Sequence, residues 1–241
     1  MEDLDAVSGK YLADKTVEIE NDLMMNWYPK RIEARIGHVG SLLELGLGHG
    51  YTVPYFAAMT DHHEVVEGSP RVIAHFKANN PWYRGRLAEG YFETYTPERR
   101  FDVIVMGFVL EHVDDPRLIL SRYRDFLAPG GKLYVAVPNA KSLNRRYGLE
   151  MGMIDDIYDL NATDHELGHK RNYCRDTLRA DIEATGYRST LEEGIYLKPL
   201  PLAVLKTLDD MEANLQAMLK VGVDFPDLCV ALLFELEVAD A

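Results

Sequence analysis

The segment Leu42-Leu43-Glu44-Leu45-Gly46-Leu47-Gly48-His49-Gly50 decides how this chain is expected to fold. It begins as an apolar run that includes an acid, and it ends with glycines at alternate positions. This pattern is typical of a buried strand that leads into a loop with few side chains, on which a ligand can lie against the backbone. A second acid, Glu67, follows 21 residues after Gly46, a spacing that suits a strand tip gripping a ribose. The segment therefore indicates a cofactor that carries a nucleoside.

The composition disfavours several classes of function. The chain has 241 residues, 47% of them hydrophobic, which is enough for one core in a single domain. Its net charge of −13 disfavours nucleic acid and anionic membrane surfaces as partners, because both attract basic proteins. Cys174 and Cys229 are too few for a disulfide framework, and we find neither a membrane-length apolar stretch nor a signal-peptide pattern. We therefore expect a cytoplasmic protein with reduced thiols.

Short apolar runs alternate with amphipathic stretches through the first 140 residues. The predicted strands are residues 41–45, 64–67, a weaker one within 83–91, 102–106 and 132–137; the predicted helices are 52–59, 70–79 and 116–126, and a turn is predicted at 129–131. This alternation predicts an α/β fold with a Rossmann-like, mostly parallel sheet and helices on both faces. Ligands bind such sheets at the carboxyl ends of the strands. Before them, apolar spacing predicts helices within 7–36, separated at Pro29.

The last hundred residues are less regular. We expect residues 138–173 to be rich in loops, 175–185 to be a helix stopped by Gly186, and 190–196 and 228–236 to be strands. Between these strands lies an amphipathic stripe with helical spacing, made of Val204, Leu208, Met211, Leu215, Met218 and Leu219. The stripe could be core, a lid or the face of a homodimer. The expected organisation is one domain, with an N-terminal helical cover (1–38), a cofactor-binding core (39–140) and a part with substrate-side loops, a helical insertion and the final strands (141–241).

Further motifs follow the glycine loop in a fixed order. The apolar run 101–106 leads into Gly107-Phe108-Val109-Leu110-Glu111-His112-Val113, a helix opened by Pro116 ends in Phe126-Leu127-Ala128-Pro129-Gly130-Gly131, and another strand ends in Val137-Pro138-Asn139. This set resembles the class I S-adenosylmethionine-dependent methyltransferases, in particular the ubiquinone-type and natural-product or sugar methyltransferases. The resemblance covers residues 42–139 and continues more loosely through 175–187. It implies a seven-stranded sheet whose antiparallel last strand, or its neighbour, is 228–236.

The resemblance implies which residues hold the cofactor, S-adenosyl-L-methionine, whose product is S-adenosyl-L-homocysteine. Three residues would lie under the methionine and ribose: Gly46, Gly48 and Gly50. Glu44 would approach the methionine amino group, and Glu67 would accept hydrogen bonds from both ribose hydroxyls. Gly68 and Ser69 would border the adenine. Phe108 and Val109 would line the methionine side.

The adenine contact departs from the family pattern. Where these enzymes often carry an aspartate that reads the adenine amino group, this chain has Tyr91 within Gly90-Tyr91-Phe92-Glu93. The resemblance therefore implies a substitute contact. The backbone amide of Phe92, ring packing or the side chain of Glu93 could supply it.

Methyl transfer makes modest chemical demands on the protein. The nucleophile must be held in line with the sulfonium methyl group, and an oxygen nucleophile usually needs a base as well. The candidate bases are His112, which follows the fourth strand, and His165 and His169 in the polar segment 161–173. Capping, packing or a solvated loop are the alternative roles. Two histidines four residues apart could share a metal on a helix, but Gly168 opposes a rigid helix and no third ligand is evident, so we expect no metal.

The remaining candidate site residues are predicted to contact the substrate. They are Trp27, Tyr28, Asn139, Arg145, Arg146, Asp164, Arg171 and Tyr173. The arginines could hold a carboxylate or phosphate, or they could be ordinary solvated charges. Trp27 and Tyr28 could close the pocket against water, or they could pack in the core.

The sequence thus predicts an enzyme that transfers methyl from S-adenosylmethionine to an oxygen or nitrogen of a small polar molecule, such as a sugar or secondary metabolite. The alternative is a catalytically silent binding module on the same fold, acting through the stripe within residues 204–219. A nicotinamide-dependent oxidoreductase is disfavoured, because its glycine loop has a different spacing and because Pro129-Gly130-Gly131 fits the methyltransferase pattern.

Overall fold

The computed structural model describes residues 19–239, so the predicted helical region before residue 19 lies outside the described residues. The strands are β1 (Val39–Leu45), β2 (Thr60–Glu67), β3 (Arg86–Glu89), β4 (Phe101–Gly107), β5 (Leu127–Pro138), β6 (Tyr187–Ile195) and β7 (Ala231–Val238). The helices are α2 (Ile19–Ile36), α3 (Val53–Ala58), α4 (Pro70–Asn79), α5 (Pro116–Arg124), α6 (Leu143–Glu150), α7 (Ala162–Leu167), α8 (Arg175–Ala184), α9 (Leu202–Leu205) and α10 (Met211–Gly222).

The strands form one seven-stranded sheet in the order β3-β2-β1-β4-β5-β7-β6. Strands β1 to β5 pair in parallel, and β7 runs antiparallel to both β5 and β6. The predicted mostly parallel sheet with an antiparallel last strand is therefore confirmed. The strand order reverses between β1 and β4, and a crevice forms at such a reversal, outside the carboxyl ends of the strands.

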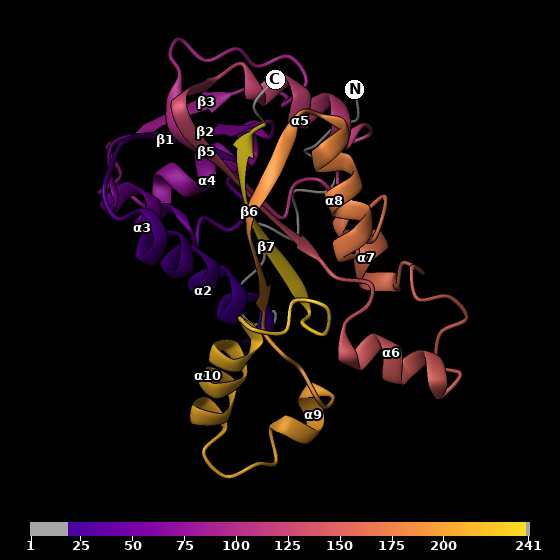
Figure 1. The fold of residues 1–241 in the computed structure, drawn as a ribbon. Helices are drawn as coiled ribbons and strands as arrows, with labels where there is room; N and C mark the ends of the chain where they lie inside the picture. The colour runs from indigo at the N-terminus through magenta and orange to yellow at the C-terminus, as the bar shows by residue number, and fades with distance from the viewer. Residues whose placement is uncertain (1–18, 240–241) are drawn as a thin grey trace.

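Helices cover both faces of the sheet, with α2 and α3 on one side and α5 and α8 on the other (Figure 1). Neighbouring residues of β1 alternate between these faces, as a pleated strand requires. Leu42 packs in the core with Tyr28 of α2, whereas Leu43 packs in the core with Ile119 of α5. Both faces of the central strands are thus buried, which explains why their sequences are apolar runs rather than alternating patterns.

Two local predictions need correction. Pro29 does not separate two helices, because it lies inside the continuous helix α2; Tyr28 and Ile32 are buried on either side of it, and this packing offsets the lost backbone hydrogen bond. The predicted turn 129–131 lies within the long strand β5, as an irregularity where the pairing with β4 shifts register and Gly130 has a φ of +74°. The region 138–173, predicted to be rich in loops, contains the short helices α6 and α7 and is otherwise mostly loop.

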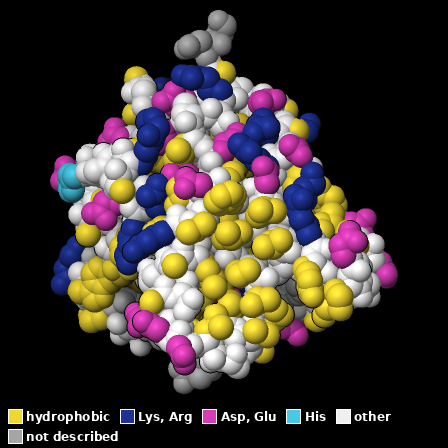
Figure 2. Space-filling model, turned by 60° about the horizontal axis from the view of Figure 1, so that its bottom comes forward, with side chains coloured by type: hydrophobic (Ala, Val, Ile, Leu, Met, Phe, Trp, Pro, Cys, Tyr) yellow, Lys and Arg dark blue, Asp and Glu magenta, His cyan; other side chains and the backbone are white. Residues whose placement is uncertain are grey.

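The amphipathic stripe is divided between two helices. Leu215 and Leu219 of α10 are buried against the core that contains α2, whereas Val204 of α9 and Leu208 after it are exposed. Figure 2 shows apolar side chains gathered on the face at the bottom of Figure 1, where α9 and α10 lie. The stripe is therefore core on one side and surface on the other.

Candidate functional site

A cavity of about 740 Å³ opens at the carboxyl ends of β1, β2 and β4, a volume in the range that suits a small organic ligand. The glycine loop after β1 forms part of its wall. Gly46, Gly48 and Gly50 have φ angles of +83°, +49° and +75°, a region that favours glycine because other residues carry a Cβ. A Cβ at Gly50 would lie 2.6 Å from the Phe76 ring. The loop therefore needs its glycines for both conformation and space.

Glu67 stands at the end of β2, where the sequence places the ribose contact. Its Oε2 accepts a hydrogen bond from the amide of Leu47 at 3.0 Å, and its Oε1 accepts one from the amide of Ser69 at 2.8 Å. Gly68 and Ser69 also line the cavity. The Ser69 hydroxyl accepts a hydrogen bond from the amide of Val72 at 3.2 Å and so caps α4. The carboxylate of Glu67 is thus fixed by backbone groups, with lone pairs still available to a ligand.

Glu44 belongs to a buried polar group at the end of β1. It is 2% exposed, accepts a hydrogen bond from the hydroxyl of Thr52, and its Oε2 lies 3.3 Å from Nε2 of His63. It also lines the cavity. Thr52 and His63 escape sequence reasoning because neither stands in a motif. Thr52 comes directly before α3, and the parallel pairing of β1 with β2 brings His63 beside β1.

Aromatic and apolar side chains complete this side of the cavity. Its lining includes Tyr91, Phe92, Glu93, Phe108 and Val109. Phe108 has a φ of +58°, an uncommon conformation for a residue with a side chain. Its amide donates to the carbonyl of Ala136 at 2.8 Å, which holds the bend at the end of β4.

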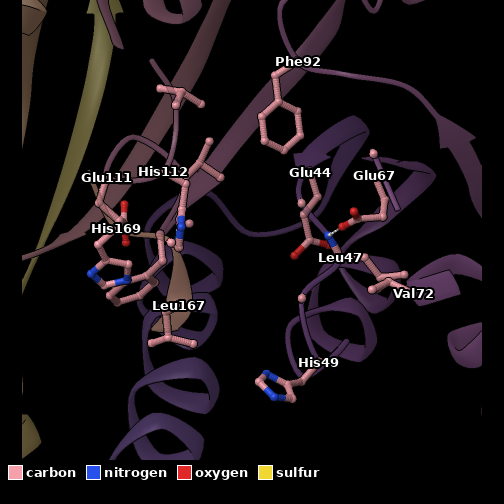
Figure 3. Close-up of a pocket in the computed structure, with 18 of the residues that line it drawn as sticks. Glu44, Leu47, His49, Glu67, Val72, Phe92, Glu111, His112, Leu167 and His169 are labelled. Carbon is pink, nitrogen blue, oxygen red and sulfur yellow. Dashed lines mark hydrogen bonds between the residues drawn. The ribbon is translucent and has the colours of Figure 1, made fainter. Parts of the chain in front are cut away.

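A second polar group, the histidine cluster, consists of Glu111, His112, Asp164 and His169. The rings of His112 and His169 meet edge to face with centroids 4.7 Å apart, and Nδ1 of His169 lies 3.4 Å from Oδ1 of Asp164. Figure 3 shows Glu111, His112 and His169 on one side of the cavity, facing Glu44, Leu47 and Glu67 on the other. The site therefore has two chemically distinct walls.

Burial sets the charge states in the histidine cluster. Glu111 is completely buried, and neither of its oxygens makes a hydrogen bond to another described residue. Desolvation raises the pKa of Glu111 to about 7. Burial, with a further contribution from His169, lowers the pKa of His112 to about 4. Within residues 19–239, the donor atoms of Glu111, His112 and His169 lie within 4.8 Å of one another, which is close enough for a shared metal ion.

The two histidines of the polar segment are not equivalent. His165 lies on α7, which ends at Gly168 with a φ of +78°. His169 follows that glycine and lines the cavity, whereas His165 is not among the lining residues. Asp164 is both the capping-box residue of α7 and the neighbour of His169.

The structure brings only two of the predicted substrate-binding residues, Tyr28 and Asp164, to the cavity. A side chain at Gly107 would overlap the Tyr28 hydroxyl, so Tyr28 reaches the end of β4. Trp27 packs against the same core. Asn139 donates to the carbonyls of Pro226 and Cys229.

The predicted arginines, together with Tyr173, hold the chain around the site instead of lining it. Arg145 donates to the carbonyls of Ile157 and Asp159, and Arg146 donates to the carbonyl of Lys141 at 2.6 Å. Arg171 donates to the carbonyls of Leu110, Val113 and Asp114. The hydroxyl of Tyr173 donates to Asp181 at 3.1 Å. These side chains secure loops through hydrogen bonds, most of them to backbone carbonyls.

Glu111 is the residue that sequence reasoning left without a role. It stands beside His112 in the motif after β4. An acid next to a histidine is the sequence feature that could have indicated a role for it. What the sequence does not show is that His169, 57 residues later, returns to the same place. Two backbone hydrogen bonds arrange this return, from Lys170 to the carbonyl of Glu111 and from His169 to the carbonyl of Asp164.

No helix in residues 19–239 combines the length and the apolar character needed to cross a lipid bilayer. Among curated proteins, the chain is similar to a trans-aconitate 2-methyltransferase of Methylobacterium radiotolerans, with 34% identity over 99 residues, which are 40% of this chain and 37% of that protein. The match thus spans well under half of that relative.

Solved structures share the fold over nearly the whole chain. The N-methyltransferase NodS of Bradyrhizobium japonicum, in complex with S-adenosyl-L-homocysteine, has a TM-score of 0.61 and 15% identity, covering 98% of each chain. A putative methyltransferase of Haloferax volcanii, in complex with the activator Trm112, has a TM-score of 0.64 and 14% identity, covering 99% of this chain and 96% of that one.

The family model described as a methyltransferase domain matches residues 21–192, which is more than half of the chain. This stretch contains the glycine loop, Glu67 and the histidine cluster. The seven-stranded, mostly parallel sheet with its helices matches the fold of the methyltransferase neighbours. The chain therefore belongs to the class I S-adenosylmethionine-dependent methyltransferase family.

Proposed function

We propose that the cavity binds S-adenosylmethionine along the glycine loop and transfers its methyl group to an oxygen or nitrogen of a small polar molecule. The observation that carries this proposal is the pair of facing walls. Glu67 is held by backbone amides on one side, and the histidine cluster stands on the other side (Figure 3). One wall suits the ribose of the donor, and the other offers proton-accepting groups to an acceptor.

The proposed division of labour follows from the chemistry of a sulfonium. Its methyl carbon is already electrophilic, so the protein mainly has to place the acceptor in line with the leaving sulfur. The donor would be held by the residues of its own wall, namely Glu44, the three glycines of the loop, Glu67–Ser69, Tyr91–Glu93, Phe108 and Val109. His169 is the preferred proton acceptor, because Asp164 lies against its Nδ1 and can stabilise an imidazolium. His112, whose low pKa keeps it neutral at pH 7, would orient the acceptor.

Titration calorimetry with S-adenosylhomocysteine tests the donor site directly. We expect saturable binding with one ligand for each chain. His169→Ala should leave this binding within about twofold while abolishing most methyl transfer, since the cluster lies opposite the donor wall. A protein that does not bind S-adenosylhomocysteine at millimolar concentration would contradict the proposal.

The relatives support a small acceptor without identifying it. Trans-aconitate 2-methyltransferase and the N-methyltransferase NodS carry names that point to small or natural-product acceptors. A cytoplasmic location and a homodimer remain part of the proposal. The exposed apolar side chains of Val204 and Leu208 could contact a second copy in a homodimer. Sedimentation analysis tests this.

A further inference from the structure

The walls of the cavity are strongly acidic. Among the described residues that line it are seven Asp or Glu side chains, one lysine and no arginine. The lysine is Lys170, and its Nζ lies 2.5 Å from Oδ1 of Asp114, so its charge is already balanced. Carboxylates without matched cations create a negative potential in a concave site.

Among the described lining residues, no unmatched lysine or arginine is therefore available to an anionic acceptor. Arg171, one of the arginines predicted to contact the substrate, donates its guanidinium hydrogen bonds to three backbone carbonyls. A buried carboxylate or phosphate that lacks such a partner is costly, because it loses its hydration without compensation. The described lining therefore offers no unmatched lysine or arginine to an acid such as the aconitate named for the curated relative.

The same wall offers an unusual concentration of acceptor groups. Glu111 has no hydrogen bond from another described residue on either oxygen. Asp164 accepts one bond, from the amide of Asn161 at 2.8 Å, and its other oxygen faces His169. A group that brings both positive charge and N–H donors would satisfy what this wall lacks.

Resting on the proposed function, we infer that the acceptor is an amine, which enters as an ammonium ion and is methylated on nitrogen. His169 takes one proton from the ammonium, and the freed nitrogen lone pair attacks the methyl carbon. The N–C bond forms as the C–S bond breaks, and the electron pair of that bond stays on sulfur as the thioether. The products are a methylated ammonium, S-adenosylhomocysteine and one proton, which His169 passes to solvent.

Charge and proton chemistry both favour nitrogen over oxygen. A hydroxyl carries no charge that the acidic wall could attract. It also holds its proton far more tightly than an ammonium does, so an imidazole would have to remove a much less acidic proton. Asp164 and the buried Glu111 stabilise the imidazolium that forms when His169 accepts the ammonium proton.

The test compares three probes that share one ring, benzylamine, benzyl alcohol and benzoate, on the protein saturated with S-adenosylhomocysteine. Nuclear magnetic resonance of labelled histidine rings reports on His112 and His169. We expect benzylamine to shift both signals at a concentration roughly tenfold lower than benzyl alcohol needs, and benzoate to leave them unchanged. Replacing S-adenosylhomocysteine with methyl-labelled S-adenosylmethionine should then place the label on the benzylamine nitrogen.

Matched variants separate charge from structure. Glu111→Gln and Asp164→Asn keep the shape of each side chain, and each should weaken the benzylamine response by roughly tenfold without changing S-adenosylhomocysteine affinity. Asp176→Asn, which changes an exposed acid outside the cavity, is the control. It should change neither the benzylamine response nor the S-adenosylhomocysteine affinity. If benzyl alcohol or benzoate binds better than benzylamine, or if benzylamine gives no response, the inference that the acceptor is an amine is contradicted. If S-adenosylhomocysteine itself does not bind, the proposed function fails instead.

Discussion

The amide of Leu47 donates a hydrogen bond to Oε2 of Glu67 over 3.0 Å, so the glycine loop and the tip of β2 are joined without a ligand. The second oxygen of Glu67 is held by the amide of Ser69. The acid that would meet the ribose is therefore fixed in advance by the backbone on both sides. A group held in this way loses little conformational entropy when the donor binds.

Removing this carboxylate should weaken donor binding. We expect Glu67→Ala to reduce S-adenosylhomocysteine affinity by about 10- to 100-fold, because charge-assisted hydrogen bonds to both ribose hydroxyls are lost. Asp61→Ala, at the exposed opposite end of β2, should have no effect in the same calorimetric titration. An affinity that is unchanged in Glu67→Ala would refute the ribose assignment.

A comparison of Gly50 with Gly130 separates two costs of adding a side chain, the strain of a positive φ and the steric overlap with a neighbour. Both have φ near +75°, but only at Gly50 would a Cβ collide with Phe76. We expect Gly130→Ala to cost about 1 kcal/mol of unfolding free energy through backbone strain alone, and Gly50→Ala to cost about 1–3 kcal/mol more through overpacking. Urea denaturation of the two variants measures the difference. Equal losses would show that the Phe76 ring moves aside freely.

Acid should destabilise the protein through Glu235. Burial alone would raise its pKa, but hydrogen bonds from Lys132, Tyr134, Thr190 and Arg35 outweigh burial and lower the pKa to about 2. Because the folded-state pKa lies below the ordinary value of 4.5, the stabilisation is complete above pH 4.5 and is lost as the pH falls toward 2. It amounts to about 3 kcal/mol.

The matching measurement is the unfolding free energy of the wild type and of Glu235→Gln between pH 6 and pH 2. The variant should be less stable at pH 6, because it leaves Lys132 and Arg35 short of their counter-charge. The difference in unfolding free energy between the wild type and Glu235→Gln should narrow as the pH falls. Glu212→Gln, an exposed acid on α10, should follow the wild type throughout. A gap that is constant with pH would show that Glu235 titrates normally.

The start of α5 gives a simpler test of a cap. One oxygen of Asp115 accepts hydrogen bonds from the amides of Arg117 and Leu118, at 2.9 and 3.1 Å. Asp115→Ala should therefore lower the melting temperature, at a cost of about 1 kcal/mol. Asp125→Ala removes an exposed acid at the other end of the same helix and should leave it almost unchanged. Equal effects would mean that the cap is not what stabilises α5.

That the glycine loop and Glu67 line one cavity could be predicted from the sequence, because these residues are local to strand tips. Gly46, Gly48 and Gly50 follow β1 directly, and Glu67 ends β2. Parallel strands bring their carboxyl ends to one edge, so spacing along the chain is enough to place these groups together. The parallel pairing of β1 to β5 likewise follows from the alternation of strands and helices.

The histidine cluster and its surroundings could not be predicted in the same way, because they depend on which loops fold back toward the end of β4. Arg145 and Arg171 looked like free cations in an acidic chain, yet each donates to backbone carbonyls. Whether a guanidinium meets a ligand or a carbonyl is decided by tertiary placement, and residue type does not reveal it. Pro29 illustrates the same limit, since burial of α2 overrides its local preference to interrupt a helix.

Strand β7 lies inside the sheet, between β5 and β6, although it comes last in the chain among the described strands. During synthesis, β5 must keep an open edge until residues 231–238 leave the ribosome, and open edges invite pairing with other chains. The cavity shares this dependence, because Val230 and Ala231 are part of its lining. A nascent chain that has already formed the glycine loop would thus still lack a complete pocket until Val230 and Ala231 have been synthesised and β7 has paired with β5.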